Sequence, residues 1–363
     1  MIPVSKPYIS NKEVKYVNDA LQSGWVSSLG PYIDQFESSF ADYCGTRFAV
    51  SVSNGTVGLH LALVALGIGL GDEVIVPDLT FVATANAVKM AQATPVMIDV
   101  KRETYCIDPL QIEMAITSRT KAIIPVHLYG HPANMSAIQE IAKKHGLMII
   151  EDAAEAHGAI IGGSRVGSMS DCGVFSFYGN KIITTGEGGI ITTDREDVYH
   201  RLRYFRDHAM SKDVRYWHTD VGFNYRMTNI QAALGLAQLE QIDHFIDQRH
   251  DQLEQYRLLL EPYGVECNPV IDCKPVNWIT CAVVNGLGRI RRDNIINRMR
   301  DRGVDARPFF FPITQLPMYA NASNPVAIKL SEDGFNLPTF VGLNNDQISQ
   351  VCKVFLACLD EVK

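Results

Sequence analysis

The hydrophobic pattern of residues 47 to 195 alternates between two periods. Short apolar runs rich in β-branched residues are separated by stretches in which apolar residues recur at helical spacing, as expected for strands joined by crossover helices. Several of the short runs are apolar throughout, which indicates that both faces of the sheet are covered. The pattern predicts an α/β domain with a mainly parallel sheet. The candidate strands are residues 48–53, 73–77, 95–99, 122–127, 147–151, 173–177 and 189–193.

The pattern changes toward the C-terminus. A helix rich in Ala, Leu and Gln is predicted at 229–239, and a longer charged helix follows at about 248–260. The remaining runs, one strand-like and two helical, suit a smaller α+β unit. They are residues 282–285, 292–302 and 345–362. Because no repeat or low-complexity linker separates the parts, we expect a large domain over residues 1–245 and a small domain over 246–363 that share an interface.

Composition and charge exclude several classes of protein. With 47% hydrophobic residues, the 363-residue chain can bury a large core. Its 33 basic and 40 acidic residues form no long block of one sign, which argues against nucleic acid or an anionic membrane as a partner. The start lacks a secretory signal and no apolar run reaches about 18 residues, so we expect a cytoplasmic protein. The eight scattered cysteines favour free thiols and no metal site.

One lysine stands in an almost uncharged segment. In GVFSFYGNKIITTGEGGIITT, Lys181 and Glu187 are the only charged residues. Lys181 lies between two strand-like runs and beside a glycine-rich turn, where partial desolvation favours the neutral, nucleophilic amine. The alternative is a loop lysine that points to water.

An acid stands at the end of a strand in LMIIEDAAEAHG. Asp152 follows four apolar residues and one other acid, so its carboxylate is expected at the C-terminal edge of the sheet, where ligands of open α/β sheets bind. A helix cap after the strand is the alternative. Glu155, three residues on, would approach the same ligand or be a solvated acid at the start of a helix.

The same edge of the sheet offers an anion cradle and a flat surface. In VSVSNGTVGLHLALVALG a strand breaks into a helix, so the backbone N–H groups of Gly55 and Thr56 would face an anion, or would form a plain turn. Ser176 and Asn224 could add polar donors. Phe81, in PDLTFVATANAVK, would cover a planar ring or be an ordinary core residue.

A lysine, a buried carboxylate, an anion cradle and a flat surface are together what an enzyme using pyridoxal 5′-phosphate (PLP) needs. A nicotinamide enzyme is the rival. However, Gly67, Gly69 and Gly71 follow a helix and precede a strand, which is the reverse of the order that a dinucleotide-binding fingerprint requires.

Six segments in order resemble the DegT/DnrJ/EryC1/StrS family of sugar aminotransferases over nearly the whole chain. They are SNGT, GDEVIVPDLTFVATANA, HLYGHP, IIEDAAEAHG, SFYGNKIITTGEGG and GFNYRMTNIQAALGLAQLE. The resemblance implies a fold type I PLP-dependent transferase, like aspartate aminotransferase, with a mostly parallel seven-stranded sheet and a smaller α+β C-terminal domain. It also implies a homodimer with shared active sites, with a tetramer as the alternative.

The resemblance assigns roles to the candidate residues. Lys181 would bind the cofactor covalently, Asp152 would pair with the pyridine nitrogen, and Phe81 would stack on the ring. The implied phosphate contacts are Gly55, Thr56, Ser176 and, from the neighbouring subunit, Asn224. Dehydratases of the family carry a histidine in place of the lysine, so Lys181 implies transamination.

Two departures from the common family pattern bear on the substrate. Glu155 in EDAAEAHG replaces a glutamine near the ring oxygen, and SFYGNK replaces SFHPTK. Both are similar to the branch that aminates C4 of GDP-4-keto-6-deoxymannose in O-antigen pathways, with L-glutamate as donor and 2-oxoglutarate as product. Arg215 and Arg226 are candidate contacts for the diphosphate. An aminotransferase for a UDP- or dTDP-linked keto sugar and a catalytically silent PLP-binding relative are the alternatives.

Overall fold

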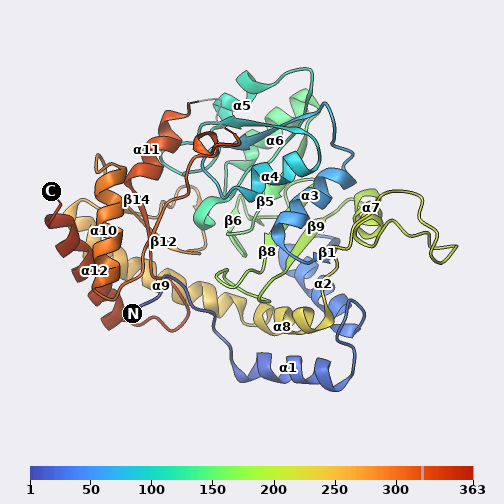
Figure 1. Ribbon diagram of the computed structural model, residues 1–363, viewed down its shortest axis with the longest axis horizontal. Helices are drawn as coiled ribbons and strands as arrows, with labels where there is room; N and C mark the ends of the chain where they lie inside the picture. Colours follow the sequence, from blue (N-terminus) through green and yellow to red (C-terminus); the bar gives the residue numbers. More distant parts are fainter. Residues whose placement is uncertain (320–322, 363) are drawn as a thin grey trace.

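A seven-stranded sheet forms the centre of the computed structural model, which describes residues 1–319 and 323–362 (Figure 1). The strand order is β1-β9-β8-β5-β4-β2-β3. Only β9 runs antiparallel to its neighbours β1 and β8, so the mostly parallel sheet that the sequence predicts is confirmed. The strands are β1 (Phe48–Val52), β2 (Glu73–Pro77), β3 (Thr94–Ile98), β4 (Thr120–Ile123), β5 (Met148–Asp152), β8 (Cys172–Ser176) and β9 (Gly189–Thr193).

One strand is shorter than predicted. The apolar run 122–127 predicts a strand to His127, but β4 ends at Ile123. Pro125 has no N–H to donate to the ladder. Val126 then forms only an isolated bridge with Asp152, and it lines the cavity described below.

Helices cover both faces of the central sheet, because its strands direct apolar side chains to both faces. In β2, Val74 and Val76 join the core on one face and Ile75 joins the core on the other. The first face packs against α3 (Gly55–Ala65), α4 (Ala83–Met90) and α7 (Glu196–Arg206). The second packs against α2 (Pro31–Cys44), α5 (Pro109–Ala115), α6 (Met135–His145) and α8 (Asn229–Leu239).

The C-terminal part has its own four-stranded antiparallel sheet and its own core. The sheet runs β10-β12-β14-β13, and the core is lined by α10, α12 and the end of α9. The elements are β10 (Glu266–Cys267), β12 (Thr280–Val283), β13 (Arg307–Pro308), β14 (Gly334–Leu337), α10 (Arg289–Asp301), α11 (Pro325–Asp333) and α12 (Asn345–Asp360). This is the α+β arrangement that the sequence predicts.

A long helix connects the two parts. In α9 (Ile242–Leu260), Phe245 packs in the core beside the central sheet, whereas Leu253 and Tyr256 pack in the C-terminal core. The expected domain boundary at 245/246 falls within this helix and stays a prediction. The N-terminus lies against the C-terminal part, where Ile2 bridges Val304 (Figure 1).

Two peripheral features complete the fold. Helix α1 (Asn11–Gln22) packs on α8, and a small sheet joins β11 (Cys273–Lys274) to the hairpin of β6 (Ile160–Ile161) and β7 (Ser164–Arg165). The segment between α7 and α8 projects from the body (Figure 1). We call residues 207–226 of this segment the projecting loop. Among the described residues, no helix is both long and apolar enough to cross a bilayer.

Candidate active site

A cavity of about 560 Å³ lies at the C-terminal ends of the parallel strands. Seven of the ten predicted site residues line it: Gly55, Thr56, Phe81, Asp152, Glu155, Ser176 and Lys181. They follow or end β1, β2, β5 and β8, whose carboxyl ends meet at one edge of the sheet. Trp278 and Phe310 reach the same cavity from the C-terminal part. The two parts of the chain therefore share this cavity.

Lys181 is largely shielded from water in the loop between β8 and β9. Its side chain is 12% exposed, and its Nζ donates a hydrogen bond to Glu155 Oε1 at 3.3 Å. The same Nζ lies 4.0 Å from the ring centre of Trp278. A carboxylate and an indole face therefore hold the amine at the cavity.

Glu155 is a buried carboxyl group with two partners. Besides the Lys181 amine, its Oε2 accepts a hydrogen bond from the backbone N–H of Tyr129 at 2.9 Å. Burial raises the pKa of Glu155, and the nearby Lys181 charge opposes that rise. Glu155 can therefore both orient the lysine and accept or hold a proton beside it.

The HLYGHP segment explains how that backbone N–H reaches the site. Tyr129 has a φ of 53°, and Gly130, with a φ of 95°, lies directly against the chain at Val276. A Cβ at Gly130 would overlap the carbonyl oxygen of Val276, so only glycine fits there. This close approach joins the loop after β4 to the segment that carries Trp278.

Asp152 ends β5 and is 5% exposed. Its carboxylate accepts hydrogen bonds from Thr84 Oγ1 at 2.7 Å and from the backbone N–H of Ala154 at 3.2 Å. Burial raises the pKa of Asp152, and these bonds lower it in part. No cationic side chain of the described residues pairs with it within 4.0 Å. A cationic group of a bound ligand would therefore find a desolvated, unpaired carboxylate here.

The anion cradle is built by close backbone packing. Asn54 caps α3 by accepting a hydrogen bond from the N–H of Val57 at 3.0 Å, which leaves the first N–H groups of the helix at the cavity. A Cβ at Gly55 would lie 2.9 Å from the Cβ of Ser176, and one at Gly189 would lie 2.9 Å from the N of Gly55. These glycines let the helix start lie directly beside the ends of β8 and β9.

The described residues fit PLP by their chemistry. A shielded amine, an unpaired buried carboxylate and a helix N-terminus beside a serine hydroxyl lie around one cavity. Phe81 is 55% exposed and lies 5.6 Å, ring centre to ring centre, from Phe310. An exposed aromatic at a cavity wall offers the flat surface that a pyridine ring needs.

Sequence reasoning did not identify three residues of this site. Thr84 lies on α4 and holds the Asp152 carboxylate, whereas Trp278 and Phe310 come from the C-terminal part. Thr84 stands in the TFVATANA segment and could have been suspected from its place on the first turn of a helix at the sheet edge. Nothing in the local pattern around Trp278 or Phe310 indicates a role, because only tertiary packing brings them to the cavity.

The other three predicted residues lie on the projecting loop and do not line this cavity. Asn224 Oδ1 accepts a hydrogen bond from Arg226 Nε at 3.0 Å, and Arg226 pairs with Asp207 at 2.7 Å. The guanidinium of Arg215 lies 5.0 Å from the ring centre of its neighbour Tyr216. Within one chain, these residues are therefore apart from Lys181 and Asp152.

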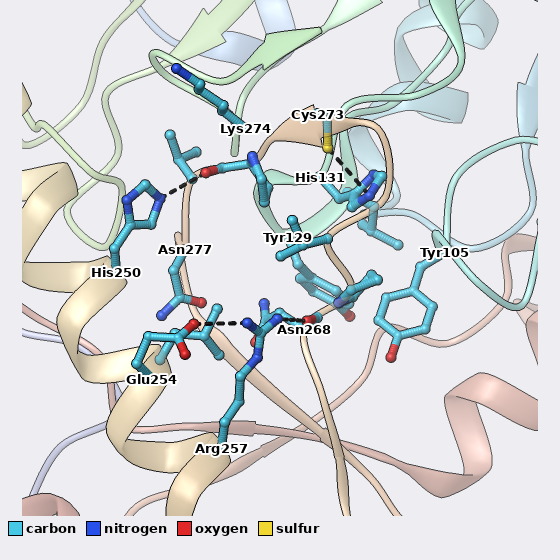
Figure 2. A pocket seen from close by; sticks show the side chains of 16 residues that line it. Tyr105, Tyr129, His131, His250, Glu254, Arg257, Asn268, Cys273, Lys274 and Asn277 are labelled. Atoms are coloured by element: carbon cyan, nitrogen blue, oxygen red, sulfur yellow. Dashed lines mark hydrogen bonds and ion pairs between the residues drawn. The ribbon is translucent and has the colours of Figure 1, made fainter. Parts of the chain in front are cut away.

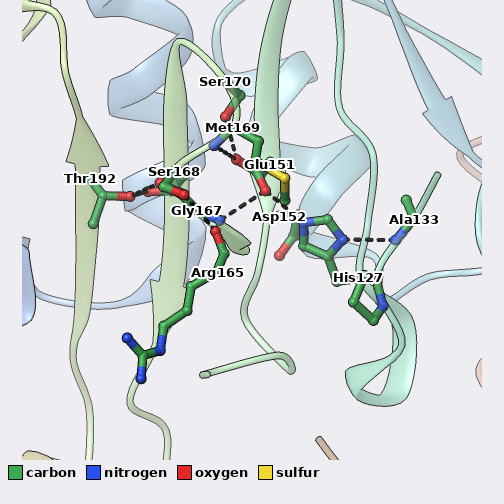
Figure 3. A network of polar contacts seen from close by, with 12 residues as sticks. His127, Ala133, Glu151, Asp152, Arg165, Gly167, Ser168, Met169, Ser170 and Thr192 are labelled. Carbon is green, nitrogen blue, oxygen red and sulfur yellow. Dashed lines mark hydrogen bonds and ion pairs between the residues drawn. The ribbon is translucent and has the colours of Figure 1, made fainter. Parts of the chain in front are cut away.

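A buried polar network around Glu151 and His127 lies next to Asp152 (Figure 3). Glu151 accepts hydrogen bonds from His127 Nε2 at 3.0 Å, from the N–H of Gly167 at 2.8 Å and from Ser170 Oγ at 2.7 Å. His127 Nδ1 accepts from the N–H of Ala133, so the neutral ring is satisfied on both sides. The backbone N–H of His127 also donates to the carbonyl of Asp152 at 3.1 Å. The network thus fixes the strand end that carries Asp152.

The network predicts a pH-dependent stability. Burial by itself raises the pKa of Glu151, but the hydrogen bonds from His127, Gly167 and Ser170 outweigh it and leave the pKa below its usual range. A carboxyl group with a lowered folded-state pKa stabilises the protein above its unfolded pKa of about 4.3, and this stability is lost as the pH falls through the folded value. Glu151→Gln should lower the urea midpoint at pH 7 and show a smaller further loss between about pH 5 and 3 than the wild type does. Equal acid-induced losses in the two proteins would contradict this interpretation.

A second cavity, of about 420 Å³, is lined in part by Tyr129 (Figure 2). Several of its polar side chains are paired with each other or with the backbone. Arg257 donates to Glu254 Oε1 at 2.8 Å, and Cys273 Sγ lies 3.5 Å from His131 Nε2. It contains no buried lysine with a facing carboxylate, so the first cavity is the candidate active site. Across residues 1–319 and 323–362, no three His, Cys, Asp or Glu side chains gather as metal ligands.

The chain is similar in sequence and fold to known aminotransferases. Residues 7–356 match the DegT/DnrJ/EryC1/StrS aminotransferase family. The chain is 45% identical over 369 residues to the GDP-perosamine synthase of Caulobacter vibrioides, covering 99% of this chain and 98% of that protein. It is 43% identical to the GDP-perosamine synthase of Escherichia coli O157:H7, with 97% of each covered. The structure superposes on Spr1654 from Streptococcus pneumoniae, in its PMP-form, with a TM-score of 0.95, 28% identity and 100% of both chains covered.

Proposed function

This chain belongs to the DegT/DnrJ/EryC1/StrS aminotransferase family, and from that premise we propose that it transfers an amino group from L-glutamate to C4 of GDP-4-keto-6-deoxymannose, giving GDP-perosamine. The enzyme is a PLP-dependent sugar aminotransferase. The observation that carries the proposal is the placement of a shielded lysine and an unpaired, buried aspartate in the wall of one cavity. The high identity to two GDP-perosamine synthases supports the choice of sugar.

We assign separate roles in transamination to the residues that line the cavity. When bound, PLP supplies an aldehyde for the amine and a ring that withdraws electrons from the reacting carbon. Lys181 would hold the cofactor through its Nζ. Once released, its amine would take the proton from the α-carbon of glutamate and pass it to the cofactor, and in the second half it would take a proton back and deliver one to C4 of the sugar. The Glu155 carboxylate, 3.3 Å from Nζ, orients the free amine after it leaves the cofactor and while it carries protons.

The remaining contacts hold the cofactor in place. Asp152 would keep the ring nitrogen protonated by its negative charge. The helix start at Gly55 and Thr56, with the Ser176 hydroxyl, would bind the phosphate, and Phe81 would cover the ring. These groups come from four strand ends, so folding of the central sheet assembles the whole set.

We further propose a homodimer in which the projecting loop completes the neighbouring site. Lys181 is the one cationic residue lining the described cavity, against Asp152, Glu155 and Glu187, yet a cofactor phosphate and a nucleotide diphosphate both need positive partners. Arg215, Arg226 and the amide of Asn224 lie on the projecting loop and do not line the cavity of their own chain. Sedimentation at the concentration of the activity assay measures the oligomeric state. A fully active enzyme that sediments as a monomer would contradict this arrangement.

We place the enzyme in the cytoplasm, because its eight cysteines are free thiols, seven of them buried. Fractionation of cells that express the tagged protein tests this, and recovery with extracellular material would overturn it.

A panel of keto sugars tests the substrate. The purified enzyme with L-glutamate is expected to convert the GDP-linked 4-keto-6-deoxymannose to a 4-amino product, identified by its mass, with equimolar 2-oxoglutarate. UDP- and dTDP-linked 4-keto sugars should react at least about tenfold more slowly in kcat/KM, the discrimination expected from a few base-specific contacts. Preference for a UDP- or dTDP-linked sugar would replace the GDP assignment. Absence of turnover on every sugar despite bound PLP would indicate a silent relative.

A further inference from the structure

Trp278 lies directly against the reactive lysine. The Nζ of Lys181 is 4.0 Å from the centre of the indole ring, within the range of a cation–π contact, and Trp278 is 5% exposed at the wall of the cavity. In this buried position the contact is stronger than it would be on the surface. The indole and Glu155 are the two groups that hold Nζ in place.

The same tryptophan also fixes the peptide next to the lysine. The indole Nε1–H donates a hydrogen bond to the carbonyl oxygen of Asn180 at 2.8 Å. Asn180 immediately precedes Lys181, so one side chain holds both the backbone before the lysine and the amine at its tip. The tryptophan is also stacked with Tyr129 at 6.2 Å between ring centres, and Tyr129 donates its N–H to Glu155.

A buried arginine holds the tryptophan in turn. Arg249, on α9 and 2% exposed, donates from Nη1 to the carbonyl oxygens of Trp278 at 2.6 Å and Thr339 at 3.3 Å. Asn277 donates back to the carbonyl of Arg249 at 3.0 Å. Burial lowers the pKa of Arg249 to about 10, and no described carboxylate pairs with it within 4.0 Å. An unpaired buried cation is destabilising in itself, and here its bonds fix the backbone of Trp278.

We propose that Trp278 is a positioning residue for Lys181: its indole face and Nε1–H keep the amine directed at the cofactor when the covalent bond between the two is open. The lysine is released from the cofactor in the first half of the reaction and rejoins it only at the end of the second half, so it must stay near and return to the same place. A side chain with four rotatable bonds would otherwise sample many positions, and each turnover would repeat the search. This inference rests on the proposed attachment of PLP to Lys181.

The test compares full-length holoenzymes of Trp278→Leu, Trp278→Phe and Phe335→Leu. Phe335 is a fully buried aromatic in the C-terminal core, so Phe335→Leu controls for loss of aromatic packing away from the lysine. Two quantities are measured: the rate at which hydroxylamine removes the cofactor from Lys181, followed by absorbance, and the separate values of kcat and KM for glutamate.

For Trp278→Leu we expect cofactor release about fivefold faster and kcat about tenfold lower, with KM within about twofold of wild type. Trp278→Phe keeps an aromatic face and should lie within about threefold of wild type in both rates. Phe335→Leu should match wild type in both rates even if it unfolds at lower temperature. If Trp278→Leu is insoluble, Trp278→Met removes the ring with less loss of volume and carries the same expectation.

Three outcomes would overturn the inference. They are a Trp278→Leu enzyme with wild-type release and kcat, equal effects in Phe335→Leu, and a Trp278→Phe enzyme as impaired as Trp278→Leu. Borohydride reduction of the wild-type enzyme distinguishes a failure of the role proposed for Trp278 from a failure of the proposed attachment of PLP to Lys181. If reduction links PLP to Lys181, only the role of Trp278 falls; if no link forms at Lys181, both proposals fall.

Discussion

Replacing Lys181 with alanine is expected to lower the rate of sugar amination by at least about a thousandfold, because the variant loses the proton carrier for both halves of the reaction. The variant should also lose the covalent link to PLP, so borohydride followed by peptide mapping should label wild-type Lys181 and leave the corresponding peptide of the variant unlabelled. The fold should survive, since a largely buried amine is removed together with its pairing to Glu155 and no apolar core is opened.

Lys143 provides the matched control. It lies exposed at the end of α6, so Lys143→Ala should keep wild-type kcat and labelling at Lys181. A Lys181→Ala enzyme that retains more than a tenth of wild-type turnover would refute the assigned role.

The same variant tests the shared active site. Lys181→Ala mixed with an Asn224→Ala/Arg226→Ala double variant should recover about a quarter of wild-type activity, because half of the randomly formed dimers carry one intact site of two. Recovery requires that the lysine and the loop residues of one site come from different chains. No recovery from two variants that do form mixed dimers would contradict the proposed dimer.

Asp152→Asn is expected to lower kcat by about 10² to 10³-fold, with little change in KM for glutamate. The amide has the shape of the carboxylate but no charge, so it cannot hold a proton on the pyridine nitrogen, and the ring withdraws electrons less strongly. The N–H of Ala154 can still donate to the amide oxygen, and the Thr84 hydroxyl can turn to accept from the amide NH2, which should keep the local structure. Steady-state kinetics and the absorbance of the bound cofactor measure the effect.

A variant of the neighbouring carboxyl group, Glu151, is the control that distinguishes a loss of activity from a loss of stability. Glu151 adjoins Asp152 on β5, but it pairs with His127 and does not line the cavity. Glu151→Gln should therefore lose stability while each folded molecule keeps most of its kcat. A wild-type kcat in Asp152→Asn, or equal losses of kcat in the two variants, would show that the charge on Asp152 does not act on the cofactor.

The sequence predicted the central sheet because each strand carries its own signal. All seven apolar runs form strands, and two of them, 73–77 and 189–193, match the observed bounds. The strand predicted at 122–127 extends beyond the observed end of β4 at Ile123. Pro125 continues the apolar pattern of the sequence, but it has no N–H to donate to the hydrogen-bond ladder of the sheet. Family membership, expected from six motifs, is confirmed by the match over residues 7–356.

The sequence by itself determined the groups that stand at the ends of strands, since parallel strands must deliver their C-terminal residues to one edge. Lys181, Asp152 and Ser176 could therefore be placed together from the order of strands and loops. Tertiary structure alone decided which side chains from elsewhere meet them. Trp278 and Phe310 reach the cavity because the C-terminal part folds against the sheet, and Arg249 holds the backbone of Trp278. Contacts of this kind between distant segments depend on packing that no local period encodes.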